Sequence, residues 1–228
     1  MRQLFELCGE NRDIRFSPYC WRARLMLEHK GLEYETVPIS FIEKQPLESA
    51  GSKTVPVLND DGTWVKDSFE IALYLEKTYP EKPLFGNDMA IAQAAVLNDW
   101  LNRTLVLGIF PMIVADIRGH LDAKNAAYFR ETREKFLGCT LEEAQGKRGE
   151  RLAPFQASLA PLRAGLRRGD YLAGDAPGWL DYAAFGPFIW AHLTSRLELL
   201  KADDPLHDWR ERMFGQFGGF MRELPRAV

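Results

Sequence analysis

Hydrophobic and polar positions alternate between strand and helix signals over residues 1–80. A short apolar run predicts a strand over Gln3–Leu7, and apolar residues recurring every three or four positions predict a helix over Pro18–Lys30. Ser17 suits its N-cap and Gly31 its end. The further elements expected here are strands over Tyr34–Ile39, Val55–Asn59 and around Trp64-Val65, a short helix over Phe41–Leu47, and a helix capped by Ser68 that ends at Thr78. This βαβ–α–ββα order predicts a small α/β domain whose first two strands are parallel, with a right-handed crossover.

The pattern after residue 88 is helical throughout, and residues 81–88, with their prolines, are expected to be a linker. The sequence therefore predicts a first domain over residues 1–80 and an all-helical domain over residues 89–228. The elements expected in the second domain are helices over Met89–Leu121, Lys124–Leu137, Leu152–Leu166, Leu180–Ser195 and Pro205–Leu224, with a polar interruption at Gly138–Gly149. Pro111 is expected to end or kink the first of these helices near Phe110.

The composition is that of an ordinary folded protein, with 46% hydrophobic and 27% charged residues among 228. A net charge of −3 gives no broad basic surface, which argues against nucleic acid or an anionic membrane as partner. The three cysteines, Cys8, Cys20 and Cys139, and the four scattered histidines show neither disulfide nor metal-site spacing. We expect a soluble cytoplasmic protein, without a secretory signal and without a bound metal.

Ser17 places a hydroxyl at the N-terminus of the first helix, where the helix dipole and free backbone N–H groups favour an anion. A hydroxyl at this point can donate a hydrogen bond to a thiolate and lower the pKa of the thiol. Ser17 as a plain N-cap is the alternative interpretation.

Two later segments also have the character of a ligand site. A cis Val55–Pro56 bond would turn the Val55 backbone outward to pair with an extended peptide, whereas an ordinary trans proline at a sheet edge is the alternative. Asp67 and Ser68 stand at another helix start, where the hydroxyl and the amides suit a carboxylate and Asp67 suits an ammonium. A plain N-cap explains the same residues.

The order and spacing of these segments resemble those of the glutathione transferases, with a thioredoxin-like first domain and a helical second domain. Within that superfamily the chain is most similar to the bacterial glutathione-dependent β-aryl etherases and their fungal relatives. The segments that carry this similarity are Ser17-Pro18-Tyr19-Cys20-Trp21-Arg22, His29-Lys30-Gly31, Val55-Pro56-Val57, residues 60–68 and residues 203–209.

The resemblance implies that glutathione is the co-substrate, that Ser17 faces its thiol, and that a cis-proline at Pro56 holds its cysteinyl part. Its γ-glutamyl part would lie at Asp67-Ser68. Thr54 stands where many relatives have Gln or Arg beside the peptide, and Lys53 is the candidate to replace that contact. The residues expected to line the pocket for a small hydrophobic or aromatic substrate are Tyr19, Trp100, Phe110 and Ile113. A homodimer is also implied.

The expected reaction is attack of the glutathione thiolate on an activated carbon, with cleavage of an aromatic β-aryl ether as its most specific form. A glutathione-dependent isomerase of the maleylacetoacetate type is a second interpretation, because Trp21-Arg22-Ala23-Arg24-Leu25 also resembles that class. A non-catalytic binder of aromatic ligands is a third. Cys20 is expected to be a buried structural thiol, and Arg22 a surface or salt-bridge residue.

One departure concerns the capping box of the long buried helix in the second domain. Gly178 replaces the hydroxyl residue of the family's Ser/Thr-x-x-Asp box, whereas Asp181 is kept. We expect a modest cost in stability and an intact helix.

Overall fold

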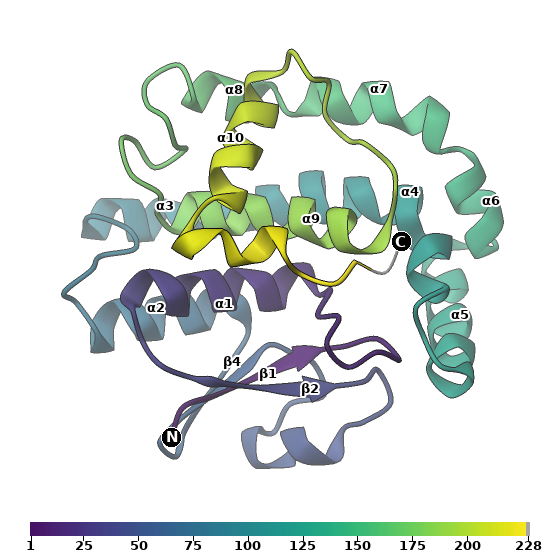
Figure 1. Cartoon of the computed structure of the whole chain (residues 1–228), viewed down its shortest axis with the longest axis horizontal. Coiled ribbons are helices and arrows are strands. Elements are labelled where there is room, and N and C mark those ends of the chain that lie inside the picture. Colours follow the sequence, from purple (N-terminus) through teal and green to yellow (C-terminus); the bar gives the residue numbers. More distant parts are fainter. Residues whose placement is uncertain (227–228) are drawn as a thin grey trace.

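A four-stranded mixed sheet forms one side of the molecule in the computed structural model, which describes residues 1–226 (Figure 1). Its strands are β1 (Gln3–Leu7), β2 (Glu35–Ile39), β3 (Val57–Asp60) and β4 (Thr63–Lys66), in the order β2-β1-β3-β4. The predicted parallel pairing of β1 with β2 is confirmed, and the other two pairs are antiparallel. β3 begins two residues later than predicted, because Pro56 has no N–H to donate to a ladder.

Two helices cover one face of this sheet: α1 (Pro18–Lys30) and α2 (Ser68–Thr78). Ser17 caps α1 and Gly31 ends it with a left-handed φ of 67°, as predicted. The N-cap of α2 is Asp67, whose carboxylate accepts from two first-turn amides, so the prediction that Ser68 is the cap is wrong by one residue. The short helix expected over Phe41–Leu47 is a 3₁₀ helix at Gln45–Ala50 (η1).

The rest of the chain is helical, so the predicted fold class, an α/β thioredoxin-like domain followed by helices, is confirmed. Its elements are α3 (Asp88–Leu101), η2 (Asn102–Val106), α4 (Leu107–Arg118), α5 (Ala123–Leu137), α6 (Leu141–Gly146), α7 (Arg148–Ser158), α8 (Ala160–Gly165), α9 (Trp179–Thr194), α10 (Pro205–Phe214) and η3 (Phe217–Arg222). The single helix predicted over residues 152–166 is interrupted at Leu159, and the last predicted helix ends at Phe214.

Pro111 lies inside α4, so of the two predicted outcomes an end of the helix near Phe110 does not occur. The irregular turn lies further upstream, where η2 is a π-helical segment and the Leu107 N–H bonds to the Asn102 carbonyl. The continuous run Asp88–Arg118 contains an 18-residue window with a mean hydropathy of 1.4, enough by length and composition for a membrane span, but 56% of that window is buried inside the protein. This burial is typical of a core helix, and such a helix alone is weak evidence for a membrane.

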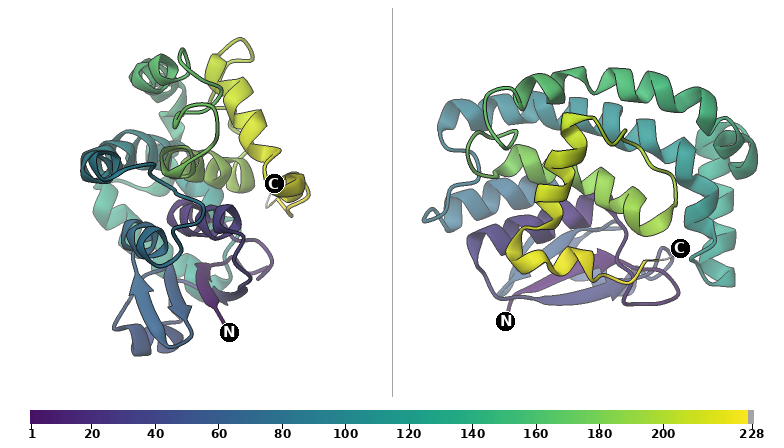
Figure 2. Two further views of the ribbon diagram at one scale, coloured as in Figure 1. Left: turned by 90° about the vertical axis from the view of Figure 1, so that its left-hand side faces the viewer. Right: turned by 45° about the horizontal axis from the view of Figure 1, so that its top comes forward.

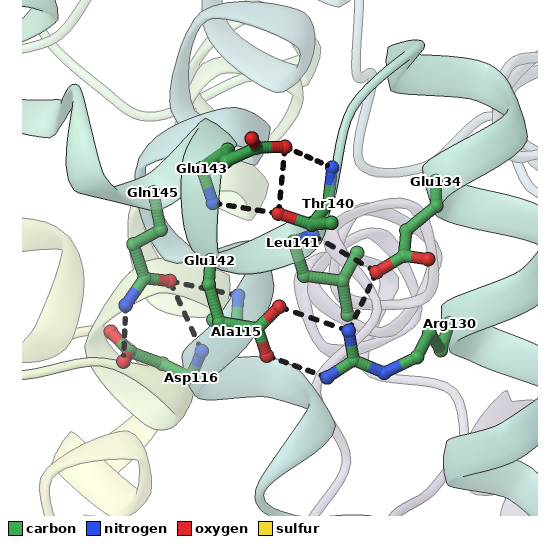
Figure 3. A network of polar contacts seen from close by, with 9 residues as sticks. All are labelled: Ala115, Asp116, Arg130, Glu134, Thr140, Leu141, Glu142, Glu143 and Gln145. Atoms are coloured by element: carbon green, nitrogen blue, oxygen red, sulfur yellow. Dashed lines mark hydrogen bonds and ion pairs between the residues drawn. The ribbon is translucent and has the colours of Figure 1, made fainter.

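The predicted polar interruption at Gly138–Gly149 contains a helix, α6, which the sequence analysis missed. Thr140 and Glu143 form a complete capping box at its start. Figure 3 shows how Arg130 of α5 pairs with Glu142 at 2.5 Å and with Glu134 at 2.6 Å, which ties α6 to the outer side of α5. The Gln145 amide makes three further bonds to the end of α4. This network fixes the position of α5 relative to α4.

The sheet domain and the helical domain meet where α9 packs along α1 (Figure 1; Figure 2). Gly186 of α9 allows this close approach, because a Cβ there would lie 2.4 Å from the Pro18 carbonyl oxygen. α9 is almost entirely buried, as the nearly all-apolar sequence predicts. The N-terminus of α1, with Ser17, is therefore held between the sheet and the central helix.

Candidate functional site

A cavity of about 810 Å³ opens beside the N-terminus of α1, within the usual size range of small-molecule sites. One wall comes from the sheet domain and contains Ser17, Tyr19 and the segment 52–56. The other wall comes from α4, α5 and α9. The cavity therefore joins the positions that the sequence predicts for glutathione to a largely aromatic surface of the helical domain.

Ser17 lines this cavity and is only 5% exposed. Its hydroxyl oxygen accepts a hydrogen bond from the Cys20 N–H, and its backbone carbonyl accepts one from the Trp21 N–H. Pro18 has no N–H, and the Tyr19 N–H has no acceptor within residues 1–226. Two donors, the Ser17 O–H and the Tyr19 N–H, are thus available at the positive end of α1, an arrangement that can hold an anionic sulfur.

The Val55–Pro56 peptide bond is cis, so the alternative of an ordinary trans proline is wrong. Within the described residues neither the N–H nor the carbonyl of Val55 has a hydrogen-bond partner. Lys53, Thr54, Val55 and Pro56 all line the cavity, with the Lys53 and Thr54 side chains exposed. An unpaired backbone beside a cavity can accept an extended peptide by strand-like pairing.

Asp67 reaches the cavity from the start of α2, with a left-handed φ of 73°. Its carboxylate accepts from Phe69 N–H at 2.7 Å and from Glu70 N–H at 3.3 Å, so it serves the helix as well as the site. Ser68 is buried beside it and is absent from the cavity wall. Of the two predicted γ-glutamyl contacts, the structure brings only Asp67 to the cavity surface.

Arg22 lies behind Tyr19 and is buried, which contradicts its prediction as a surface or salt-bridge residue. Its guanidinium bonds to Asn98 and Asn102 at 3.3 and 2.7 Å, and it stacks 5.1 Å from the Tyr19 ring centre. Burial lowers the Arg22 pKa to about 10 and raises the pKa of Tyr19. Arg22 therefore places a positive charge against the face of the Tyr19 ring, which lines the cavity at the start of α1.

The helical wall matches the predicted substrate pocket in part. Tyr19 and Phe110 line the cavity as predicted, whereas Trp100 and Ile113 do not. Ile113 lies on the same face as Phe110 and Ile117 of α4, which do line the cavity, but its side chain is fully buried beneath the cavity surface. The wall residues that the sequence analysis missed include Phe41, Lys44, Tyr128, Phe129, Arg133 and Trp190. The spacing of Phe129 and Arg133, four residues apart on α5, was the available signal.

Cys20 is completely buried, and burial together with the nearby Glu6 charge raises its pKa to about 12. Its thiol is thus neutral and structural, as predicted. Across residues 1–226, no three His, Cys, Asp or Glu side chains are close enough to hold a metal ion.

Comparison with known proteins identifies the class that this fold and cavity define. The family model for the glutathione S-transferase N-terminal domain matches residues 16–78, and that for the C-terminal domain matches residues 92–217. The chain belongs to the glutathione S-transferase family.

Among curated relatives, glutathione S-transferase Z1 of Arabidopsis thaliana is 38% identical over 73 residues, which cover 30% of this chain and 33% of that protein. The glutathione S-transferase-like protein ustS of Aspergillus flavus is 25% identical over 199 residues, 75% of this chain and 72% of that one. The chain thus spans only a third of the plant relative.

Two solved fungal structures share the fold over nearly the whole chain. A glutathione S-transferase of Ceriporiopsis subvermispora, solved with glutathione, has a TM-score of 0.77 at 23% identity, covering 98% of this chain and 94% of its own. Glutathione transferase GSTFuA2 of Phanerochaete chrysosporium has a TM-score of 0.76 at 25% identity, covering 100% and 99%.

Proposed function

We propose that this chain is a glutathione transferase in which the Ser17 hydroxyl and the Tyr19 N–H hold the thiolate of bound glutathione. The observation that carries the proposal is that Ser17 and Tyr19 line the same cavity as Val55, whose backbone N–H and carbonyl have no hydrogen-bond partner within residues 1–226. A peptide paired with Val55 brings its thiol toward the N-terminus of α1, where donors and dipole lower the pKa of the thiol. Ser17 stays protonated and acts as a hydrogen-bond donor.

The rest of glutathione lies along the segments that flank this point. Its cysteinyl amide pairs with Val55, and Lys53 and Thr54 border the peptide. Its γ-glutamyl end lies at the start of α2, where the free amides favour the carboxylate and Asp67 favours the ammonium. The Ser68 hydroxyl supports the carboxylate from its buried position at the first residue of α2.

The proposed reaction is displacement at an activated carbon of an aromatic substrate, most specifically an aryl ether. The glutathione sulfur forms a bond to the carbon that bears the aryloxy group, the carbon–oxygen bond breaks, and the phenolate leaves with the electron pair. Water protonates the phenolate after release. The similarity of residues 17–22, 60–68 and 203–209 to bacterial β-aryl etherases supports this choice, as does the aromatic wall with Phe110 stacked on Trp190 at 6.2 Å.

The first test is calorimetric titration of glutathione into the wild-type protein and the Ser68→Ala variant. Binding should weaken by about 1–3 kcal/mol in the variant, the usual cost of leaving a charged partner unsatisfied. Ser158→Ala, an exposed serine on α7, is the matched control and should bind as the wild type does. If the wild type binds no glutathione, the proposed function fails at its first step. If the wild type binds glutathione and aromatic ligands quench its fluorescence, but no conjugate forms, the protein is a non-catalytic binder of aromatic ligands.

A second candidate is glutathione-dependent isomerisation of a maleylacetoacetate-type dicarboxylate. The observation that favours it is the presence of Lys44 and Arg133 in the cavity wall, because cations suit an acidic substrate. Conversion of added maleylacetoacetate to fumarylacetoacetate, in the absence of any displacement of aryl ethers, would select this reaction.

We also propose that the chain forms a homodimer in which α3 is the contact surface. Met89 and Val96 on this helix are 70% and 73% exposed, and Leu97 beside them is 37% exposed. Large apolar side chains grouped on one exposed helix are typical of a protein interface. Light scattering should find a dimer for the wild type and a monomer for Val96→Lys, whereas Ala164→Lys on α8 should leave the dimer intact. A monomeric wild type would contradict this proposal.

A further inference from the structure

The cavity wall is strongly cationic for a site that accepts a hydrophobic substrate. Four positive side chains and one carboxylate line it, which gives a net charge of +3; they are Lys44, Lys53, Lys66, Arg133 and Asp67. Glutathione bound as the thiolate brings three negative groups and one ammonium, so it offsets only part of this charge. One positive charge remains for another anion.

Arg133 is the cation that the glutathione site leaves unused. It belongs to α5 in the helical domain, whereas Lys53 and Lys66 flank the segment that pairs with the peptide. No carboxylate within residues 1–226 forms an ion pair with Arg133, and the only protein hydrogen bond of its guanidinium goes to the neighbouring Thr132 hydroxyl at 3.0 Å. Burial lowers its pKa, because a guanidinium out of water without a counter-charge is disfavoured.

Aromatic rings hold the Arg133 guanidinium at the cavity surface. Its centre lies 5.3 Å from the Phe41 ring and 5.1 Å from the Phe129 ring, and these two rings lie 5.3 Å apart. On the outer side of α5, Arg130 is paired with Glu134 and Glu142, which fixes the helix (Figure 3). The charge is therefore positioned before any ligand enters, which reduces the entropy cost of binding.

Lys44 approaches the same end of the cavity from the loop after β2. It is half-buried, and both burial and the positive charge of Arg133 lower its pKa. An anion bound in the cavity relieves the repulsion that the Arg133 charge exerts on the Lys44 ammonium.

We propose that the electrophilic substrate is an aromatic carboxylic acid whose carboxylate pairs with the Arg133 guanidinium, while its ring lies against the aromatic wall. The fork of the guanidinium matches a carboxylate in two parallel hydrogen bonds, and Lys44 adds to the positive potential. This inference rests on the proposed transferase function and adds the class of substrate to it. Arg133 is then a specificity-determining residue that touches the substrate at the end remote from the reacting carbon.

The binding test uses 3,5-dinitrobenzoate and its methyl ester, which differ in charge and carry no leaving group. Each is titrated calorimetrically into the glutathione-loaded wild type, Arg133→Met, Arg133→Lys and Lys135→Met. Lys135 is an exposed cation on the same helix and outside the cavity wall, so it is the matched control. The acid should bind about ten- to a hundredfold more weakly to Arg133→Met, with partial recovery in Arg133→Lys and no change in Lys135→Met.

The ester and glutathione itself should keep their affinities in all variants. If acid and ester weaken together in Arg133→Met, Arg133 only supports the aromatic wall and the proposal is wrong. If glutathione loses affinity there, Arg133 serves the carboxylate of glutathione instead, and the proposal is again wrong. An affinity for the acid that Arg133→Met leaves unchanged would also overturn it.

A kinetic test separates this inference from the proposed function. The pair is 4-chloro-3,5-dinitrobenzoate and its methyl ester, in which the carbon–sulfur bond forms and chloride leaves with the electron pair. Arg133→Met should raise KM for the acid about ten- to a hundredfold and leave the ester unchanged. If neither compound is conjugated above the uncatalysed rate while the acid still binds through Arg133, the transferase function fails and the acid site stands. If both are conjugated equally by the wild type and Arg133→Met, the acid site fails.

Discussion

The Ser17 hydroxyl oxygen accepts a hydrogen bond from the Cys20 N–H at 3.3 Å. Because the oxygen is the acceptor in this bond, the hydroxyl hydrogen remains available to a group in the cavity. The N-cap interpretation and the catalytic interpretation of Ser17 are therefore compatible, since the same hydroxyl caps α1 and offers a donor to sulfur. The Tyr19 N–H beside it is the competing donor.

Ser17→Ala should lower kcat/KM for conjugation about ten- to a hundredfold, because the variant loses a hydrogen bond to a charged sulfur. The pKa of bound glutathione, followed by thiolate absorbance against pH, should rise toward the value of the free thiol. The loss of the cap should cost about 1 kcal/mol of stability, measured by urea unfolding.

Ser17→Thr keeps a hydroxyl at the cap and is the control for this loss. It should retain a lowered thiol pKa. If Ser17→Ala binds glutathione and turns over as the wild type does, the Tyr19 N–H and the helix dipole hold the thiolate and the role assigned to the hydroxyl is wrong.

The sheet-domain half of the site was predictable because its signals are local. Ser17 before Pro18, and the Val55-Pro56 pair, define backbone positions that depend little on distant residues. The helical wall was only partly predictable, because Phe110 and Ile113 lie on the same face of one apolar helix and the sequence does not tell which of the two side chains reaches the cavity surface. Arg133 was missed because only the packing of α5 against the sheet domain brings it beside Phe41.

Two helix boundaries in the helical domain differ from the prediction. Pro111 lies inside α4 without ending it, and the irregular hydrogen-bond pattern of this run is the π-helical segment η2 further upstream. The Thr140-x-x-Glu143 pattern is typical of a capping box and could have predicted the start of α6. The polar composition of the segment favoured a loop instead.

Gly178→Ser should destabilise the protein, although it restores the hydroxyl of the family's capping box. A Cβ at this position would lie 2.9 Å from the Leu84 carbonyl oxygen and 2.9 Å from the Ala173 Cβ. Asp181 meanwhile accepts bonds from Gly178 N–H, Leu172 N–H and two further donors, so α9 starts well without the hydroxyl. We expect a loss of about 1–3 kcal/mol in urea unfolding, the usual cost of overpacking.

Gly149→Ser is the control for this substitution, because nothing lies within 4 Å of a Cβ at Gly149. That variant should be nearly as stable as the wild type. A Gly178→Ser protein more stable than the wild type would show that the cap outweighs the contact with Leu84.

Cys20 should resist iodoacetamide at pH 8 in the folded protein, because its buried thiol has a pKa of about 12 and the thiolate is the reactive form. Mass spectrometry of the intact protein and its peptides locates the modification, and unfolding in urea should make Cys20 reactive. Rapid alkylation of Cys20 in the folded state, with loss of conjugation, would contradict its structural role.

Because of Glu6, the free energy of unfolding should fall as the pH rises from about 4.3 toward 7. The lower limit is the ordinary pKa of a glutamate in an unfolded chain. The Glu6 carboxyl on β1 is fully buried, and burial raises its pKa to about 7 although Arg24 and Arg15 lie 3.8 and 3.9 Å away. The arginines lower the pKa less than burial raises it, since neither forms a hydrogen bond to Glu6. Cys20 and Tyr34 are the other titratable groups whose pKa values Glu6 raises.

Between these two pH values the folded protein binds a proton at Glu6 that the unfolded chain has released, so raising the pH favours unfolding by up to about 1.4 kcal/mol per pH unit. Glu6→Gln has no such proton, so the free energy of unfolding of the wild type relative to this variant should decrease across the interval and level off above pH 7. Urea unfolding from pH 4.5 to 8 measures this difference, and Glu35→Gln, an exposed carboxylate on β2, should leave the pH profile of the wild type unchanged. A wild-type profile that runs parallel to that of Glu6→Gln would mean that Glu6 is ionised in the folded protein throughout, with Arg15 and Arg24 outweighing its burial.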